Sequence, residues 1–148
     1  MYDTILFPTD GSETATEAAD HAVDLATRHD ADFHILYVVD HHRVSQMAPK
    51  LGTDHIKRTL EQEGERITTE VAALASDAGL ETTVSLEEGA PGETITTYAA
   101  TVGADAIVMG TNGRSGMDRL LLGSVAERVI QNADLPVLTV KPPAKDEP

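Results

Sequence analysis

The chain has no cysteine and no tryptophan, few other aromatic residues and only four lysines. The absence of cysteine excludes disulfides, a thiolate nucleophile and thiolate-bound zinc. No segment reaches the roughly 18 apolar residues that a membrane-spanning helix needs, and the first eight residues lack the basic and apolar regions of a signal peptide. These absences favour a soluble cytoplasmic protein. A length of 148 residues is enough for one domain with one hydrophobic core.

Positive charge is also scarce, with 11 basic residues against 25 acidic ones and a formal net charge of −14. Such a surface repels DNA, RNA and anionic lipid, so we expect no nucleic-acid or membrane partner. An acid-rich, lysine-poor surface suits a salt-rich cytoplasm, where counterions screen the self-repulsion. We therefore expect a halophilic protein, with an ordinary acidic mesophile protein as the alternative.

Apolar runs alternate with amphipathic segments along the whole chain. The runs predict five strands, at residues 4–7, 33–39, 82–86, 105–109 and 136–140. Helical spacing predicts a long helix over residues 54–78, with Gly79 as its left-handed C-terminal cap. The side chains expected to face inward from this helix are Ile56, Leu60, Ile67, Val71, Leu74 and Ala75. Residues 40–53 have no clear period and contain Pro49 and Gly52, which indicates a surface loop.

This alternation predicts the α/β class. We expect a single-domain, open, twisted sheet of five parallel strands in the order 3-2-1-4-5, with helices on both faces. The domain covers residues 1–141, and a flexible C-terminal tail covers 142–148. Ligands of such sheets bind beyond the carboxyl ends of the strands, where the strand order reverses. That position falls between the first and fourth strands, at the loops 8–12 and 110–124.

The second of these loops has the spacing Gly110-x2-Gly113-x9-Gly123-Ser124, between a predicted strand and a predicted helix. Glycines let the backbone approach an anion, and the following helix offers free N–H groups and the positive end of its dipole. The loop is neither a Walker A loop nor a dinucleotide fingerprint, because Gly-Lys-Ser/Thr and Gly-x-Gly-x-x-Gly do not occur. Spacing alone leaves a phosphate-binding loop and a plain turn equally favoured.

Two segments carry a resemblance to a known family. Residues 5–12, Ile-Leu-Phe-Pro-Thr-Asp-Gly-Ser, and the glycine pattern from Met109 to Val125 are similar to motifs of the universal stress protein family, in particular its ATP-binding subgroup. The resemblance covers essentially the whole chain and is weakest over residues 41–53. It implies a Rossmann-like fold of the adenine nucleotide alpha hydrolase type, and it favours the phosphate-binding interpretation of the glycine loop.

The resemblance also implies a nucleotide site. In it, Asp10 faces the nucleoside, Val38 meets the adenine edge through its main chain, and Gly110 lies against the ribose. The full set implied is Pro8, Thr9, Asp10, Val38, Met109, Gly110, Gly113, Gly123, Ser124 and Val125. From its position after the first strand, Asp10 is a ligand-facing carboxylate or, as the alternative, a helix cap.

Two arginines of the glycine loop, Arg114 and Arg119, are candidate phosphate contacts, with solvated loop arginines as the alternative. The implied cofactor is ATP. Mg²⁺ or Mn²⁺ would accompany it through phosphate oxygens and water, without a direct protein ligand, because few carboxylates converge here.

The function expected is that of an ATP-binding universal stress protein, a nucleotide-dependent regulatory or stress-response module with at most slow ATP hydrolysis. Neither loop offers an evident general base or a Walker-type lysine. The enzyme alternative is an adenine-nucleotide hydrolase or nucleotidyl-transfer domain, favoured by turnover above ~1 s⁻¹. A third reading is a structural dimer with a vestigial pocket. A homodimer through Val137–Val140 is expected, because this strand forms a sheet edge and the family dimerises through it.

Overall fold

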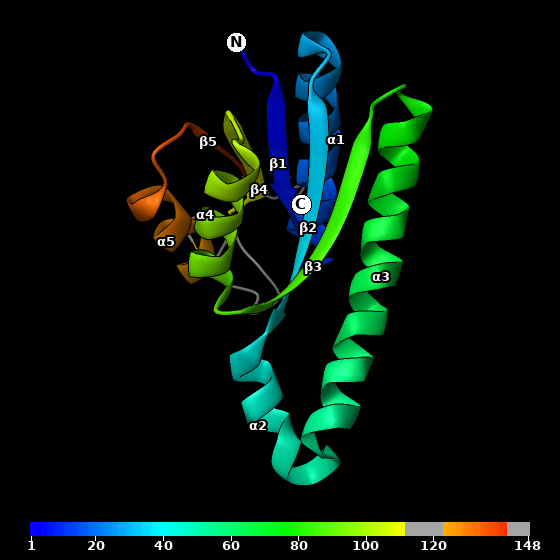
Figure 1. The fold of residues 1–148 in the computed structure, drawn as a ribbon, viewed down its shortest axis with the longest axis vertical. Helices are drawn as coiled ribbons and strands as arrows, with labels where there is room; N and C mark the ends of the chain where they lie inside the picture. The colour runs from blue at the N-terminus through cyan, green and yellow to red at the C-terminus, as the bar shows by residue number, and fades with distance from the viewer. Residues whose placement is uncertain (112–122, 142–148) are drawn as a thin grey trace, which may run out of the picture.

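The computed structural model describes residues 1–111 and 123–141, which form one open sheet with helices on both faces (Figure 1). Strands and helices alternate along the chain, except that two helices follow the second strand. In chain order the elements are β1 (Thr4–Pro8), α1 (Glu13–His29), β2 (Asp32–Asp40), α2 (His41–Leu51), α3 (Thr53–Asp77), β3 (Thr82–Gly89), α4 (Pro91–Val102), β4 (Ala106–Gly110), α5 (Ser124–Asn132) and β5 (Val137–Val140).

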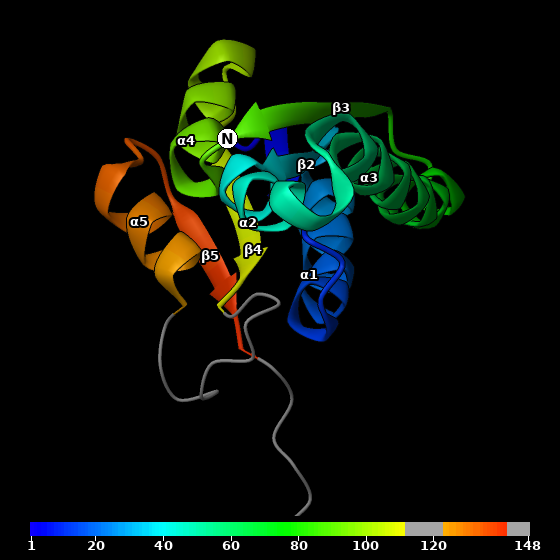
Figure 2. The same cartoon turned by 90° about the horizontal axis from the view of Figure 1, so that it is seen from below.

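The strand order is β3-β2-β1-β4-β5, and each of the four pairings is parallel. The predicted fold class and strand order are therefore confirmed. Figure 2 shows α1 and α3 on one face of the sheet and α4 and α5 on the other. Because consecutive parallel strands need a crossover, each connection places a helix on a face, and the strand order reverses beside β1.

The core on the first face forms where an alanine-rich side of α1 lies on the sheet. Small side chains at helical spacing let the helix approach the strands closely, and Phe7 of β1 stacks on Phe33 of β2 with ring centroids 6.2 Å apart. The α1 residues buried there are Thr14, Ala15, Ala18, Ala19, Ala22, Val23 and Ala26. On the second face, α4 and α5 cover Leu6, Leu36 and Ile107. Both faces of β1 are thus buried, as the continuous apolar run predicts.

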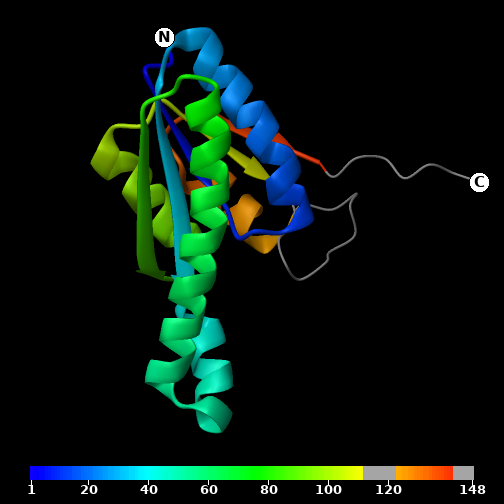
Figure 3. The same cartoon turned by 90° about the vertical axis from the view of Figure 1, so that its right-hand side faces the viewer.

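The surface loop predicted for residues 40–53 is wrong, because residues 41–51 form helix α2. The carboxylate of Asp40 caps this helix by accepting the N–H of His42 at 2.9 Å. Val44 is buried against Ile56 and Leu60 of α3. Pro49 lies in the last turn of α2, and Gly52, at φ +85°, separates α2 from α3. Figure 3 shows that α2 and the start of α3 project beyond the strands as a helical arm.

Smaller differences concern α3 and β3. Five of the six side chains expected to face inward from α3 are buried, but Leu74 is 39% exposed. The buried side near the end of the helix is narrow, running through Val71 and Ala75, and Leu74 lies beside it. Gly79 adopts the predicted left-handed conformation, at φ +83°, and its N–H donates to the carbonyl of Ser76. Strand β3 continues three residues beyond the predicted end, to Gly89.

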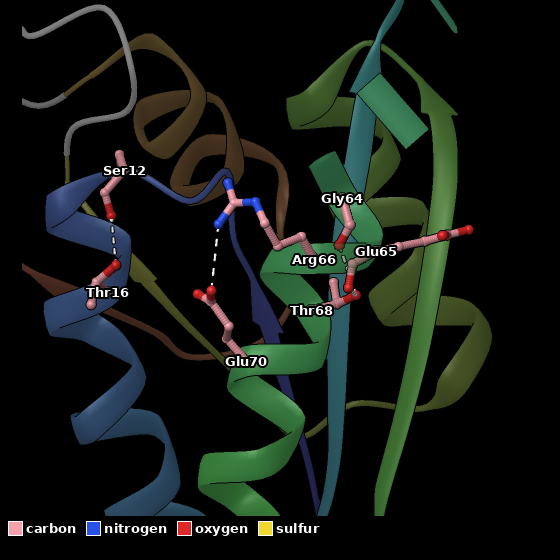
Figure 4. A network of polar contacts seen from close by, with 7 residues as sticks. All are labelled: Ser12, Thr16, Gly64, Glu65, Arg66, Thr68 and Glu70. Atoms are coloured by element: carbon pink, nitrogen blue, oxygen red, sulfur yellow. Dashed lines mark hydrogen bonds and ion pairs between the residues drawn. The ribbon is translucent and has the colours of Figure 1, made fainter. Parts of the chain in front are cut away.

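Helix α3 approaches the sheet closely at Gly64. A Cβ added to Gly64 would lie 2.5 Å from Cδ2 of Tyr37, a side chain that is 2% exposed. In the next turn, the buried hydroxyl of Thr68 donates to the carbonyl of Gly64 at 2.8 Å (Figure 4). An exposed ion pair of the same helix, between Arg66 and Glu70, contributes little because water screens it. The absence of a side chain at Gly64 is therefore what allows the helix to lie over Tyr37.

Replacing Gly64 with alanine tests this contact. An alanine in an ordinary helix interior stabilises by up to about 1 kcal/mol relative to glycine. Here the added methyl group overpacks the core, and we expect a net loss of about 1–2 kcal/mol in the free energy of unfolding, measured by equilibrium denaturation. The matched control is Gln62→Ala at an exposed position of the same helix. A Gly64→Ala protein as stable as the wild type would contradict the packing argument.

Candidate functional site

A cleft of about 390 Å³ lies at the carboxyl ends of the central strands, where the strand order reverses. This volume falls in the range of small-molecule binding pockets. The ends of β1, β2 and β4 form its floor, and the first turns of α2, α4 and α5 contribute to its walls. The lining residues are Pro8, Thr9, Asp10, Ala15, Leu36, Tyr37, Val38, Asp40, Arg43, Pro91, Ile95, Met109, Gly110, Thr111, Gly123, Ser124, Val125 and Ala126.

Most residues of the sequence-predicted site lie together in this cleft. Those that line it are Pro8, Thr9, Asp10, Val38, Met109, Gly110, Gly123, Ser124 and Val125. They come from three strand ends and one helix that are far apart in the sequence. The remaining predicted residues, Gly113, Arg114 and Arg119, lie outside the residues that the structure describes, as does the predicted tail at 142–148.

The turn after β1 is fixed by its own hydrogen bonds. The N–H of Thr9 donates to the carbonyl of Leu36 at 2.9 Å and prolongs the pairing with β2. One residue on, Oδ1 of Asp10 accepts the N–H of Ser12 at 2.9 Å, while the hydroxyl of Ser12 caps α1 by accepting the N–H of Ala15. The cap of α1 is therefore Ser12, and Asp10 lines the cleft with its carboxylate anchored to the turn.

The four helices that begin at this edge differ in how their first turns are capped. Side chains cap α1 and α2, through Ser12 and Asp40. Helix α4 has no side-chain cap, but it begins with Pro91, which lacks an N–H, and carries Glu93 in its first turn. Gly123 is the N-cap residue of helix α5, and no side chain of the described residues caps this helix. The N–H of Gly123 donates to the carbonyl of Thr111 at 2.7 Å, which ties this helix start to the end of β4. The first turn of α5 thus brings main-chain N–H groups and a positive dipole end to the cleft, an arrangement suited to an anion.

Gly110 has a packing role that the sequence did not reveal. A Cβ at this position would lie 2.7 Å from Cγ2 of Thr14, 3.1 Å from the carbonyl carbon of Thr14 and 3.2 Å from the nitrogen of Ala15. Two of these atoms belong to the backbone of α1, which cannot turn aside as a side chain can. Close packing of β4 against the start of α1 is therefore a sufficient reason for glycine here, whatever lies in the cleft.

Sequence reasoning missed several lining residues, above all Asp40 and Arg43. Both belong to the segment that was expected to be a loop, and the folding of α2 brings Arg43 to the cleft within the first turn of the helix. Pro91 and Ile95 also line it. Their signal was present in the sequence, because Pro91 opens the helix that follows β3, and every helix start after a parallel strand falls on this edge.

The carboxylates of the cleft do not form a metal site by themselves. In the described residues no three acidic or histidine side chains are grouped as metal ligands. Asp10 and Asp40 each have one oxygen bound to a main-chain N–H of the following turn. Within the same residues, no helix combines the length and apolar character needed to cross a bilayer.

The fold and the cleft together define a Rossmann-like α/β domain with its candidate site at the switch point of the sheet. The model of the universal stress protein family matches residues 1–141, and the chain belongs to this family. Among its relatives, universal stress protein MJ0531 of Methanocaldococcus jannaschii is 41% identical over 146 residues, which cover 99% of this chain and 86% of the relative.

Solved structures agree with this assignment. The structure of protein MJ0577, a universal stress protein of the same organism, superimposes with a TM-score of 0.86 at 32% identity and covers 99% of both chains. A universal stress protein solved in complex with cAMP has a TM-score of 0.69 at 28% identity, over 94% of this chain and 96% of that one. The family and fold that the resemblance implied are therefore confirmed.

The contact at Gly110 generates a stability prediction. Because the added methyl group would press on the backbone of α1, we expect Gly110→Ala to lower the free energy of unfolding by about 2 kcal/mol, as overpacked sites do. Combining it with Thr14→Ser, which removes Cγ2 and keeps the hydroxyl, should restore only part of the loss. A double-mutant cycle by chemical denaturation measures this coupling. The interpretation fails if Gly110→Ala alone is as stable as the wild type.

Proposed function

We propose that the chain is an ATP-binding universal stress protein, a nucleotide-dependent regulatory or stress-response module with at most slow ATP hydrolysis. The observation that carries this proposal is the first turn of α5, which opens on the cleft at the switch point without a side-chain cap among the described residues. Main-chain N–H groups at a helix start provide hydrogen bonds and a favourable potential for phosphate. The N–H groups of Ser124 and Val125 and the hydroxyl of Ser124 then bind the triphosphate.

The nucleoside occupies the part of the cleft floored by β1 and β2. Apolar side chains line it there, among them Pro8, Val38 and Ile95, and the polar groups are few, as is usual for a small-molecule pocket. The carboxylate of Asp10 faces the same region and suits the hydroxyl groups of a ribose. A relative 28% identical to this chain was solved with cAMP, which consists of adenine, ribose and phosphate and so supports an adenine nucleotide as the ligand class.

Mg²⁺ or Mn²⁺ accompanies the nucleotide and is held by phosphate oxygens and water, because the described carboxylates of the cleft are engaged by main-chain N–H groups and are not grouped as ligands. The chemistry of the described lining favours binding over catalysis. It contains no lysine to stabilise a leaving phosphate, and Asp10 and Asp40 follow β1 and β2 rather than the α5 side of the cleft.

Substituting Ser124 with proline tests the proposed phosphate site, the first turn of α5, without disturbing the helix. Ser124 is the first residue of α5, where proline is well tolerated, and Gly123 already has the extended conformation, φ −71° and ψ 157°, that a residue before proline adopts. The variant loses one main-chain N–H and the hydroxyl. Since hydrogen bonds to charged groups contribute about 1.5–3 kcal/mol, we expect ATP affinity to fall at least tenfold in a calorimetric titration.

Two further variants complete this experiment. Ser124→Ala removes the hydroxyl alone and separates its contribution from that of the N–H. Glu13→Pro places the same residue at the same position of α1, a helix whose extended cap residue, Ser12, also accommodates it and whose exposed first residue does not line the cleft. It should bind ATP as the wild type does. If Ser124→Pro leaves the affinity unchanged, or if the wild type binds no ATP, the proposed function is wrong.

The same proposal includes a homodimer through β5. This strand is the last of the sheet, pairs only with β4 among the described residues, and carries Leu138, which is 45% exposed. The carbonyl of Pro136 accepts the N–H of Ile107 in β4, and the carbonyl of Val140 accepts the N–H of Thr111, the residue after β4. Because groups alternate along a strand, the N–H and carbonyl of Thr139 point to the free edge, where a second copy can pair.

Thr139→Pro should abolish this dimer. Proline removes the outward N–H of the edge strand while the hydrogen bonds to β4, made by its neighbours, are retained. We expect the wild type to sediment as a dimer and the variant as a monomer at micromolar concentration, with the unfolding transition preserved. A wild-type monomer, or a dimeric variant, would contradict pairing through β5.

A further inference from the structure

Arg43 is a half-buried cation that the binding scheme above leaves unused. It lies in the first turn of α2 and lines the cleft, and it is the only cation among the described lining residues. Two carboxylates, those of Asp10 and Asp40, line the same cleft. Arg43 nevertheless makes no ion pair with any residue in 1–111 or 123–141.

Local structure gives no reason for an arginine at this position. The positive end of the helix dipole lies at the first turn of α2, where acidic residues are favoured and cations are not. The first turn of α2 contains no acidic residue; it begins His41-His42-Arg43. The packing of α2 against α3 depends on the next residue, Val44, which is 5% exposed. The position of Arg43 is therefore explained by the cleft better than by the helix.

Arg43 lies on the side of the cleft away from the proposed phosphate site, the first turn of α5. Arg43 follows β2, whereas the first turn of α5 is tied to the end of β4, and β1 lies between these two strands. Since neighbouring strands are about 4.8 Å apart, the two sides are separated by roughly 10 Å. Arg43 thus lies beside the region assigned to the nucleoside, next to Val38 and Asp40 of the same strand end.

In the described part of the chain, that region has aliphatic walls and no exposed aromatic ring. Pro8, Val38 and Ile95 offer a surface for one face of a base, and the one aromatic lining residue, Tyr37, is 2% exposed. The guanidinium of arginine is planar and weakly hydrated and stacks well on the face of a π system. We infer that Arg43 stacks on the outer face of the bound purine and is a specificity-determining residue that favours purine over pyrimidine nucleotides.

This inference rests on the proposed function and is tested on the full chain by titration calorimetry. The variants are Arg43→Gln, which removes the charge, and Arg43→Lys, which keeps the charge and removes the planar group. Both should bind ATP about tenfold more weakly than the wild type, and the ratio of ATP to CTP affinity should fall by a similar factor. Inorganic tripolyphosphate, measured by displacement of ATP, should bind all three proteins equally.

The matched control is Arg58→Gln, which removes one positive charge from an exposed position of the neighbouring α3 that does not line the cleft. It should leave every affinity unchanged. Wild-type affinity in Arg43→Lys, or an equal loss for tripolyphosphate, would show a charge contact with phosphate and overturn the stacking inference. ATP binding that is the same in Arg43→Gln and the wild type would overturn it too, while leaving the proposed function intact. A wild type that binds no ATP overturns both.

Discussion

The parallel pairing of every strand is the constraint on which the rest of this structure depends. Parallel strands direct all their carboxyl ends, and the helix starts that follow them, to one edge of the sheet. At that edge β1 is buried between β2 and β4, and the helices after these strands leave toward opposite faces. Topology alone therefore predicts a crevice between those helix starts, and the described residues form a cleft there.

Which ligand the cleft can bind depends on whether side chains cap the first turns of the helices that begin there. A side-chain cap pairs one main-chain N–H of the first turn, as Ser12 does in α1 and Asp40 in α2. In α5, the N–H of the N-cap residue Gly123 donates to the carbonyl of Thr111, and the first turn of the helix lines the cleft. The same fold thus contains both kinds of helix start at one edge. Helix α4 also lacks a side-chain cap, but its first residue is Pro91 and its first turn carries Glu93, so α5 is the start better suited to phosphate.

The sequence predicted the architecture well because its signals were local and repeated. The apolar runs at residues 4–7 and 33–39 each have one simple structural meaning, and the glycine spacing pointed to the edge of the sheet where the cleft lies. Helix α2 was missed because only Val44 of its eleven residues is buried, so its periodicity was too short to detect beside Pro49 and Gly52. For the same reason Arg43 was missed as a lining residue, because the position of a side chain in an expected loop cannot be predicted from the sequence.

The role of Gly110 shows a different limit. The resemblance assigned this glycine to the ligand, whereas the contacts of a hypothetical Cβ involve Thr14 and Ala15 of α1. A glycine that allows a close approach looks the same in a sequence whether a ligand or another part of the backbone approaches it. Only the three-dimensional neighbours of the position separate the two explanations, and at Gly110 they favour backbone packing.

Charge places a last constraint on how an acidic chain binds an anion. With a net charge of −14, the surface repels a polyphosphate over a Debye length of about 8–10 Å, and salt weakens that repulsion. Main-chain N–H groups bind at about 3 Å, inside the distance over which salt screens, and add no net charge. Backbone donors at the first turn of α5 therefore let the cleft bind at contact distance an anion that the acidic surface repels at long range.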